Sequence, residues 1–330
     1  MREPTTCFVA ERLNSTTFKI VEEDQYLEYP QVFVKILDET LVIVDTGCGG
    51  AAKGPDVALT SLREYLETVP LADNGKELLN PGARLSYTVV CTHCHFDHIG
   101  TSLLSIEDGV WGVEQFGDHP KSLICASSYD RSFLSPANLS RNSLCENIGI
   151  RTPLYKVSHW LGDGQFLQHN SHSLPLQVFH TPGHTPDELA AWDPDERVLF
   201  IGDSFYEWVP IIFPSHGNMI RFSDSIGKMK QLIAGWNADE SSSRVKIACG
   251  HVTYCADGEA ILNDVDEFLW LVVTGAVKPK QSEESRGEIF DLYEGDGGKY
   301  SIRCPRRLVV DFRADEEAMT KLKRRNGLIL

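Results

Sequence analysis

The first third of the chain alternates short apolar runs with turn residues. Val32 to Ile36 and Leu41 to Val44 are β-branched runs separated by Asp38-Glu39, and this pattern predicts a β-hairpin. From Pro55 to Val69, apolar residues recur near the 3.6-residue period, which predicts an amphipathic helix. Leu85 to Thr92 is expected to be the next strand, and it runs directly into a group of histidines.

The second half of the chain repeats this alternation of strands and helices. The pattern predicts the following strands: Leu176 to His180, Val198 to Gly202, Val245 to Cys249, Glu288 to Tyr293, Tyr300 to Cys304 and Leu308 to Phe312. Long helices are expected from Ser223, as N-cap, to Trp236 and from Asp257 to Thr274, and a last helix begins near Asp315.

No linker rich in Gly, Ser or Pro divides the chain, so residues 1–330 are expected to form a single domain. Residues 110–170 are irregular and rich in Ser, Asn and Gly, with one strand predicted at Ser122 to Ser127. We expect this stretch to be an insertion. The strands from about 276 to 330 are expected to form a β-rich C-terminal extension.

Composition limits the partners. The chain has 330 residues and a formal net charge of −16, which argues against a nucleic-acid partner. No apolar run approaches the roughly 18–20 residues of a membrane span, and the N-terminal residues lack the apolar stretch of a secretory signal. We therefore expect a cytoplasmic protein with no membrane partner, whose nine cysteines are reduced thiols. The oligomeric state stays open, a homodimer included.

The strongest chemical signal is the sequence His93-Cys94-His95-Phe96-Asp97-His98 at the end of a predicted strand. In an extended segment, side chains two residues apart point to the same side, so His93, His95 and Asp97 are expected to face together. His98 would reach a second point beside them once the chain turns into a helix. Imidazoles and a carboxylate placed in this way suit two adjacent divalent metals.

Three later strand ends offer further ligands of the same kind. His184 follows a strand and a Pro-Gly turn, Asp203 follows the strand that ends at Gly202, and His251 follows Gly250. Together with the histidine cluster they would complete two coordination spheres. Cys94 is expected to point away from its histidine neighbours, and Cys94, Cys249 and Cys255 are expected to be packing residues.

Asp45, the 93–98 cluster, His184, Asp203 and His251 occur in the order and context of the five motifs of the metallo-β-lactamase fold superfamily, which the chain resembles from about Val32 to Thr274. The resemblance implies a four-layer αβ/βα sandwich with a dinuclear site, holding two Zn²⁺ ions per chain, with iron or manganese as alternatives. His93, His95 and His184 would hold one metal. Asp97, His98 and His251 would hold the other, Asp203 would bridge them, and Asp45 would orient a ligand.

Within that superfamily, Asp203-Ser204-Phe205-Tyr206 resembles the D-x-x-Y element of quorum-quenching lactonases, and the flanking sequence is similar to that of fungal hydrolases that open small lactams and lactones. The likeness implies a hydrolase that opens a small cyclic amide or ester, a role that would suit detoxification of foreign compounds. A hydroxide shared by the metals would attack the carbonyl, the Tyr206 hydroxyl would stabilise the oxyanion, and Asp203 or Asp97 would shuttle the proton.

Other interpretations stay open at this point. One is that Tyr206 is only a packing residue, and the apolar residues Trp208, Ile211, Ile212 and Phe213 either line a substrate pocket or belong to the core. Thioester or glyoxalase-II-like hydrolysis and a mono-iron persulfide dioxygenase are the alternatives that keep the histidines. A serine hydrolase is disfavoured because the chain has no G-x-S-x-G. A degenerate binding module is disfavoured because all seven ligand positions are filled.

Overall fold

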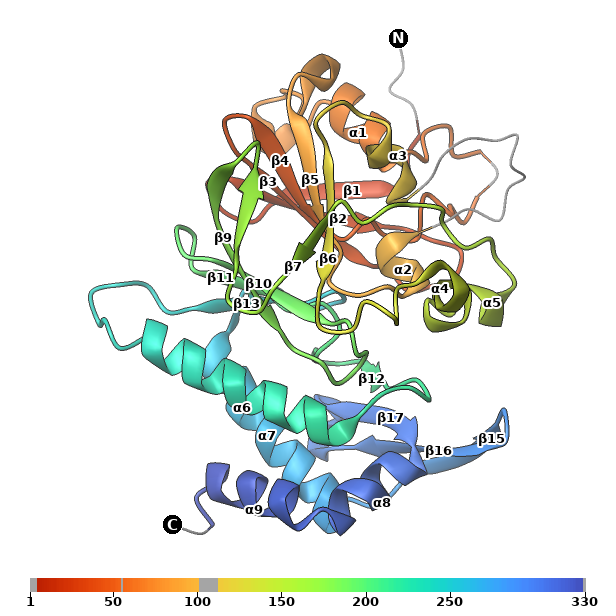
Figure 1. The fold of residues 1–330 in the computed structure, drawn as a ribbon, viewed down its shortest axis with the longest axis vertical. Helices are drawn as coiled ribbons and strands as arrows, with labels where there is room; N and C mark the ends of the chain where they lie inside the picture. Colours follow the sequence, from red (N-terminus) through yellow and green to blue (C-terminus); the bar gives the residue numbers. More distant parts are fainter. Residues whose placement is uncertain (1–4, 55, 101–111, 329–330) are drawn as a thin grey trace. The chain divides into compact units, whose positions relative to one another are not determined.

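The computed structural model describes residues 5–54, 56–100 and 112–328, and the chain forms two compact units. Unit 1 comprises residues 1–178 and 194–196, and unit 2 comprises residues 179–193 and 197–330. Among the helices of the described residues, none combines the length and apolar character that a bilayer crossing requires. Each unit contains sheet strands and helices (Figure 1). Each also has a hydrophobic core of its own.

Unit 1 is built on a seven-stranded sheet whose strands follow one another in chain order. Its strands are β1 Phe8–Arg12, β2 Thr17–Glu22, β3 Gln31–Ile36, β4 Thr40–Val44, β5 Ser86–Val90, β6 Leu123–Ser127 and β7 His159–Leu161. The first four are antiparallel, and β4 to β7 run parallel. The predicted hairpin is confirmed as β3 and β4. Because β4 and β5 are parallel, the residues that follow them meet at one edge of the sheet.

The helices of unit 1 are short. They are α1 Leu62–Thr68, α2 Phe96–Ile99, α3 Glu114–Gly117, α4 Pro136–Asn142 and α5 Cys145–Ile148, with 3₁₀ turns at Ala72–Asn74 and Pro81–Ala83. The helix expected from Pro55 begins seven residues later, at Leu62, because the Ser61 side chain accepts a hydrogen bond from the Glu64 N–H and caps it there. Pro55 itself lies outside the described residues. Buried Tyr65 and Leu66 of α1 pack into the same core as the strands.

The stretch 110–170 is more regular than its composition indicates. It contains α3, β6, α4, α5 and β7, and then β8 Phe166–His169, which pairs with β9 His172–His180. The strand predicted at Ser122 to Ser127 is confirmed as β6, whose residues are mostly buried. Val110 and Trp111, at the start of the predicted insertion, lie outside the described residues. The Ser and Asn residues of this stretch lie in α4 as well as in the loops beside β6 and β7, so their number does not exclude ordered elements.

Unit 2 contains two smaller sheets. Within unit 2, the strands of the first follow the order β14-β13-β11-β10, with β10 Leu189–Asp193, β11 Val198–Phe200, β13 Lys246–Ala248 and β14 Ala256–Asp257. The second has the order β12-β17-β16-β15, with β12 Pro210–Ile212, β15 Gln281–Ser285, β16 Glu288–Glu294 and β17 Ser301–Pro305. β10 and β11 pair as an antiparallel hairpin. Because β11 and β13 are parallel, the residues that follow them again share one edge.

Four helices complete unit 2: α6 Met219–Trp236, α7 Gly258–Thr274, α8 Arg306–Ala314 and α9 Glu316–Arg325. Helix α7 begins as predicted, with the Asp257 side chain accepting from the Ala260 N–H. The N-cap assigned to Ser223 is wrong, because Asn218 caps α6 by accepting from the Arg221 N–H. Ser223 lies inside α6, and its Oγ accepts a 2.7 Å hydrogen bond from Arg325.

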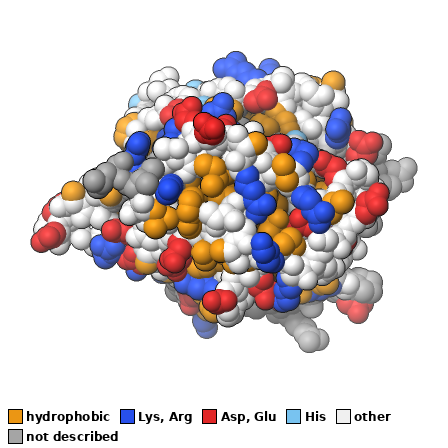
Figure 2. Space-filling view, turned by 90° about the horizontal axis from the view of Figure 1, so that it is seen from below, with side chains coloured by type: hydrophobic (Ala, Val, Ile, Leu, Met, Phe, Trp, Pro, Cys, Tyr) orange, Lys and Arg blue, Asp and Glu red, His pale blue; other side chains and the backbone are white. Residues whose placement is uncertain are grey.

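The strand predicted at Leu308 to Phe312 is wrong, because this segment lies in α8. Leu308, Val309 and Phe312 are buried at helical spacing in the core of unit 2. The last helix is confirmed as α9. One residue of its basic C-terminal end contacts the interior of unit 2, because the Arg325 guanidinium pairs with the fully buried Asp266 carboxylate at 2.8 Å. Figure 2 shows the face of unit 2 that carries α8 and α9, where Lys and Arg side chains are interspersed with hydrophobic ones.

Candidate metal centre

The histidine cluster of unit 1 lies where β5 ends and α2 begins. His93, His95, Asp97 and His98 are all buried, at 0–6% exposure. His93 and His95 lie together, with 3.1 Å between His93 Nε2 and His95 Nδ1. Asp97 and His98 sit in α2, where Asp97 Oδ2 lies 3.6 Å from His98 Nε2. The helix starts at Phe96, so the two-residue alternation holds for the two histidines and stops before Asp97.

Asp45 fixes the orientation of this cluster from the neighbouring strand end. Its Oδ1 accepts from the Thr92 N–H at 2.7 Å, and its Oδ2 accepts from the Thr92 hydroxyl and from His98 Nδ1, each at 2.8 Å. A carboxylate at Nδ1 selects the tautomer with its proton there, so His98 presents the lone pair of Nε2. The backbone of Asp45 is left-handed, with φ of 63°, in a loop of otherwise glycine-rich sequence.

Unit 2 assembles the second set of ligand-type side chains at the edge of β11 and β13. His251 Nε2 lies 3.4 Å from Asp203 Oδ2, and His184 Nε2 lies 4.0 Å from the same oxygen. All three residues are buried. The two strand-end loops are held together by a 2.7 Å hydrogen bond from the Gly250 N–H to the Gly202 carbonyl.

The loop that carries His184 approaches α6 closely, and this approach requires glycine at position 183. A Cβ atom there would lie 2.5 Å from the Cα of Phe222. The Asn218 N–H donates to the Gly183 carbonyl at 2.8 Å and fastens the loop to the start of the helix. The Pro-Gly turn before His184 therefore sets where this imidazole can lie.

Tyr206 lies beside the imidazole of His251. The two ring centroids are 5.5 Å apart at an interplanar angle of 72°, and the tyrosine is only 5% exposed. Tyr206 also belongs to the hydrophobic core of unit 2. The ring is therefore packed, as one interpretation expected, and it is also next to a candidate ligand, as the other expected.

The apolar residues after Tyr206 separate into two kinds. Ile211 and Phe213 are buried in the core, whereas Trp208 and Ile212 are 62% and 45% exposed. The core interpretation therefore holds for Ile211 and Phe213 and not for Trp208 and Ile212. In an extended segment alternate side chains face opposite sides, and only one side of β12 is buried.

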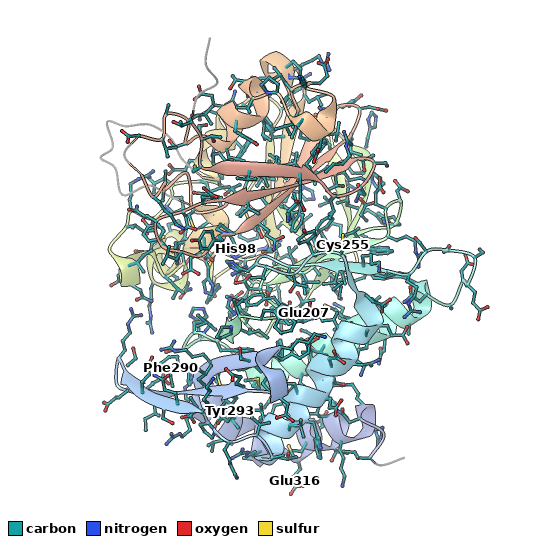
Figure 3. The ribbon with its side chains drawn as sticks, turned by 180° about the vertical axis from the view of Figure 1, so that it is seen from behind. His98, Glu207, Cys255, Phe290, Tyr293 and Glu316 are labelled. Carbon is teal, nitrogen blue, oxygen red and sulfur yellow. The ribbon has the colours of Figure 1, made fainter. Side chains whose placement is uncertain are left out.

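The cysteines near the ligands differ in exposure. Cys94 and Cys249 are fully buried in the cores of unit 1 and unit 2, and burial raises the pKa of the Cys249 thiol well above its ordinary value. The packing role predicted for these two is confirmed. It is wrong for Cys255, which is exposed just before β14 (Figure 3).

Sequence reasoning missed two residues that hold these loops. Thr92 links Asp45 to the histidine cluster through both its N–H and its hydroxyl. Thr253 accepts from the Glu207 N–H at 2.8 Å and donates its own N–H to the His251 carbonyl at 2.5 Å. Threonine next to a ligand motif was the available signal for Thr92, and no local pattern singles out Thr253.

The donor chemistry of both sets fits divalent transition metals. Each unit buries imidazole and carboxylate groups side by side, and buried groups of this kind are costly unless they are paired or coordinate a metal. Nitrogen and oxygen donors suit zinc, iron and manganese. The Asp45–His98 pair adds the carboxylate support that metal-binding histidines usually have.

Comparison with known proteins identifies relatives of this chain. The family described as the metallo-beta-lactamase superfamily matches residues 155–243, which include His184 and Asp203. A protein from Aspergillus versicolor named "Putative transcription factor avaE" is 32% identical over 315 residues, covering 93% of this chain and 89% of that protein. The acyl-coenzyme A thioesterase MBLAC2 from Homo sapiens is 28% identical over 206 residues, covering 58% of this chain and 63% of that enzyme.

Among solved structures, a metallo-beta-lactamase family protein from Thermus thermophilus has a similar fold. It superposes with a TM-score of 0.55 at 18% sequence identity, over 82% of this chain and 85% of that one. At this identity the likeness concerns the fold. It agrees with the sheet-and-helix layers found in each unit.

Proposed function

This chain belongs to the metallo-beta-lactamase superfamily and is a metal-dependent hydrolase, and we propose that its substrate is a small lactam or lactone. The observation that carries the proposal is the position of Tyr206. Its ring lies 5.5 Å from that of His251, three residues after Asp203, whose carboxylate lies 3.4 Å from the same imidazole. A phenol beside candidate metal ligands is suited to bind the carbonyl oxygen of a small acyl substrate.

The proposed centre follows the ligand pattern that the resemblance to the superfamily implies. His93, His95 and His184 would hold one metal, Asp97, His98 and His251 would hold the other, and Asp203 would contribute to both. In support, the 93–98 cluster follows β5, Asp203 follows β11 and His251 follows β13, and each of these strands has a parallel partner. In α/β sheets the loops after parallel strands carry the ligands. Zinc is the proposed metal, because it accepts a mixture of imidazole and carboxylate donors.

Bound divalent ions would supply Lewis acidity and a nucleophilic water at neutral pH. Side chains of the protein would stabilise the oxyanion and transfer the proton. The Tyr206 hydroxyl would donate to the oxygen that becomes negative, an interaction worth about 3–4 kcal/mol where one such donor has been removed from other enzymes. Asp203 or Asp97 would pass a proton to the leaving group. Buried surroundings strengthen each of these interactions, because water does not compete for them.

Thioester hydrolysis is the second candidate, favoured by the likeness to the acyl-coenzyme A thioesterase. A thiolate leaves without a proton more readily than an amide nitrogen, so a thioesterase depends less on Asp97 or Asp203 as proton donor. A small-molecule substrate is part of the proposal in either case. The net charge of −16 disfavours binding to the phosphate backbone of nucleic acids, whatever the relative from Aspergillus versicolor does.

The test is a hydrolysis screen with metal-reconstituted protein and three matched acyl compounds. γ-Butyrolactone, 2-pyrrolidinone and acetyl-coenzyme A present an ester, an amide and a thioester, and the Asp203→Asn variant is the control for contaminating activity. Hydrolysis of the lactone or lactam above the rate of that variant supports the proposal. Hydrolysis of the thioester alone would favour the second candidate, and no hydrolysis of any ring or thioester would contradict both.

A further inference from the structure

Trp208 is the feature of unit 2 that the proposed chemistry leaves unused. Its indole is 62% exposed, although tryptophan is usually largely buried. Its backbone is left-handed, with φ of 71°, which is rare for a bulky residue and strained. Strained backbone of this kind persists only where the surrounding structure enforces it, and it is concentrated at functional sites.

The backbone around Trp208 is fastened on both sides. The Trp208 N–H donates to the Lys299 carbonyl at 2.7 Å, and the Glu207 N–H donates to Thr253 Oγ1 at 2.8 Å. These bonds tie the segment to Lys299, two residues before β17, and to the loop that follows His251. Segment 206–208 is therefore held in place between two other parts of unit 2.

Side chains add a second set of contacts to the same segment. Lys299 Nζ lies 3.0 Å from both Glu207 Oε1 and Asp264 Oδ2, and the Tyr300 hydroxyl donates to Asp264 at 3.1 Å. The Lys299 side chain is 37% exposed, so each pair alone contributes little. Together they form a network that links the C-terminal extension and α7 to Glu207, which Figure 3 labels.

The same segment is continuous with the candidate ligands. Tyr206 contacts His251 ring to ring, and Thr253, which holds Glu207, donates its N–H to the His251 carbonyl. Trp208 therefore displays its indole two residues from Tyr206, on a support that includes the His251 loop. An indole held in this way offers a flat apolar face at low conformational cost, because its side chain has only two torsions to fix.

We infer that Trp208 is a specificity-determining residue whose indole packs against a planar aromatic ring of the substrate. The inference rests on the proposed function and narrows its substrate class to acyl compounds that carry such a ring beside the scissile bond. It also gives the C-terminal extension a role, since Lys299 holds the backbone that presents the indole.

The experiment compares two γ-lactones, 2-coumaranone, whose lactone is fused to a benzene ring, and γ-butyrolactone, which has none. For each lactone the kcat/KM of a variant is divided by that of the wild type, which cancels the difference in intrinsic reactivity. Trp208→Ala is expected to lower this ratio about 3–10-fold for 2-coumaranone and to leave it within about 2-fold for γ-butyrolactone. Trp208→Phe, which keeps a flat ring, is expected to retain most of the preference.

Ile212→Ala is the matched control, because Ile212 is an exposed apolar residue on the adjacent β12 and should change neither ratio. An equal change for both lactones, or no change for either, would overturn the inference while leaving the proposed function intact. If wild-type protein cleaves thioesters instead of lactones, S-phenyl and S-ethyl thioacetate replace the lactone pair. A wild type that cleaves none of these compounds contradicts the proposed function itself, and the inference falls with it.

Discussion

The carboxylate of Asp45 holds the imidazole of His98 by a 2.8 Å hydrogen bond to Nδ1, and both residues are buried in unit 1. Asp45 follows β4, His98 lies in α2, and they are 53 residues apart in the chain. The left-handed backbone of Asp45 turns its carboxylate toward Thr92 and His98 at once. Asp45, at the end of β4, thus orients His98, a candidate ligand carried by α2.

Asp45→Asn is therefore expected to weaken metal binding about 10–100-fold, because the amide no longer fixes the tautomer of His98. Competition with a chromophoric chelator measures this affinity. Asp24→Asn is the matched control, since Asp24 is an equally buried aspartate of unit 1 that accepts from the Tyr26 and Tyr29 N–H groups. Equal metal affinity in Asp45→Asn and wild type would show that the pair does not support a ligand.

The purified protein is expected to carry about two zinc ions per chain, because seven nitrogen and oxygen donors with one shared carboxylate match two coordination spheres. Elemental analysis of protein purified without chelator measures this ratio. One iron per chain, with oxygen consumed in the presence of persulfides, would contradict both zinc and hydrolysis.

Asp203→Ala and His184→Ala are each expected to lose most activity and at least one metal, since both residues lie in the ligand set of unit 2. Cys94→Ala is expected to keep most of both, because Cys94 is buried in the core of unit 1. Metal content and thermal unfolding are measured together. Loss of metal from Cys94→Ala at unchanged stability would mean that this thiol is a ligand.

Tyr206→Phe keeps the ring that packs against His251 and removes only the hydroxyl. If that hydroxyl donates to the oxyanion, kcat should fall about 10–1000-fold while metal content and thermal stability stay unchanged. Steady-state kinetics on the lactone and the lactam measure this. A rate near that of the wild type would make Tyr206 a packing residue and favour the thioester candidate.

Glu22 predicts a pH dependence of stability. Burial first, and the nearby Asp24 charge to a lesser degree, raise the pKa of its carboxyl from 4.5 to about 8, although the Gly50 N–H lowers it. Between these values the folded state holds a proton that the unfolded state releases, so the free energy of unfolding falls as the pH rises from 4.5 to about 8.

Glu22→Gln removes this titration. The free energy of unfolding of this variant and of the wild type is measured in urea from about pH 5 to about pH 9. The variant's value minus the wild type's value should increase as the pH rises and become constant above about pH 8. Glu23→Gln, at an exposed neighbouring position, is the control. A difference between Glu22→Gln and wild type that does not change with pH would mean that Glu22 is charged in the folded state at neutral pH.

Residue pattern predicted the ordered elements well where burial and local capping agree. The β3–β4 hairpin and the start of α7 at Asp257 both follow from local rules. The segment 308–312 misled the prediction because a short apolar run with two valines, Val309 and Val310, fits a strand as well as a helix face. Only the packing of that face into the unit 2 core selects the helix.

The candidate ligands could be proposed from the sequence because imidazoles and carboxylates cluster at residues 93–98 and recur after predicted strands at His184, Asp203 and His251. The residues that hold the ligand loops in place were harder to predict. Asp45 could be named from its motif, yet Thr253 and Lys299 act through backbone groups and hydroxyls that any sequence offers. Such contacts form between segments that are far apart in the sequence, so no local residue pattern predicts them.

One of the nine cysteines offers a site for selective chemical labelling. All nine lie in the described part of the chain, none is in a disulfide, and Cys255 is the one that is exposed. Burial raises the pKa of the Cys7, Cys125 and Cys304 thiols to about 12, which disfavours the reactive thiolate. A maleimide fluorophore should therefore label the folded native sequence at Cys255, four residues after His251. A single reporter dye beside a candidate ligand loop is thus available without mutagenesis.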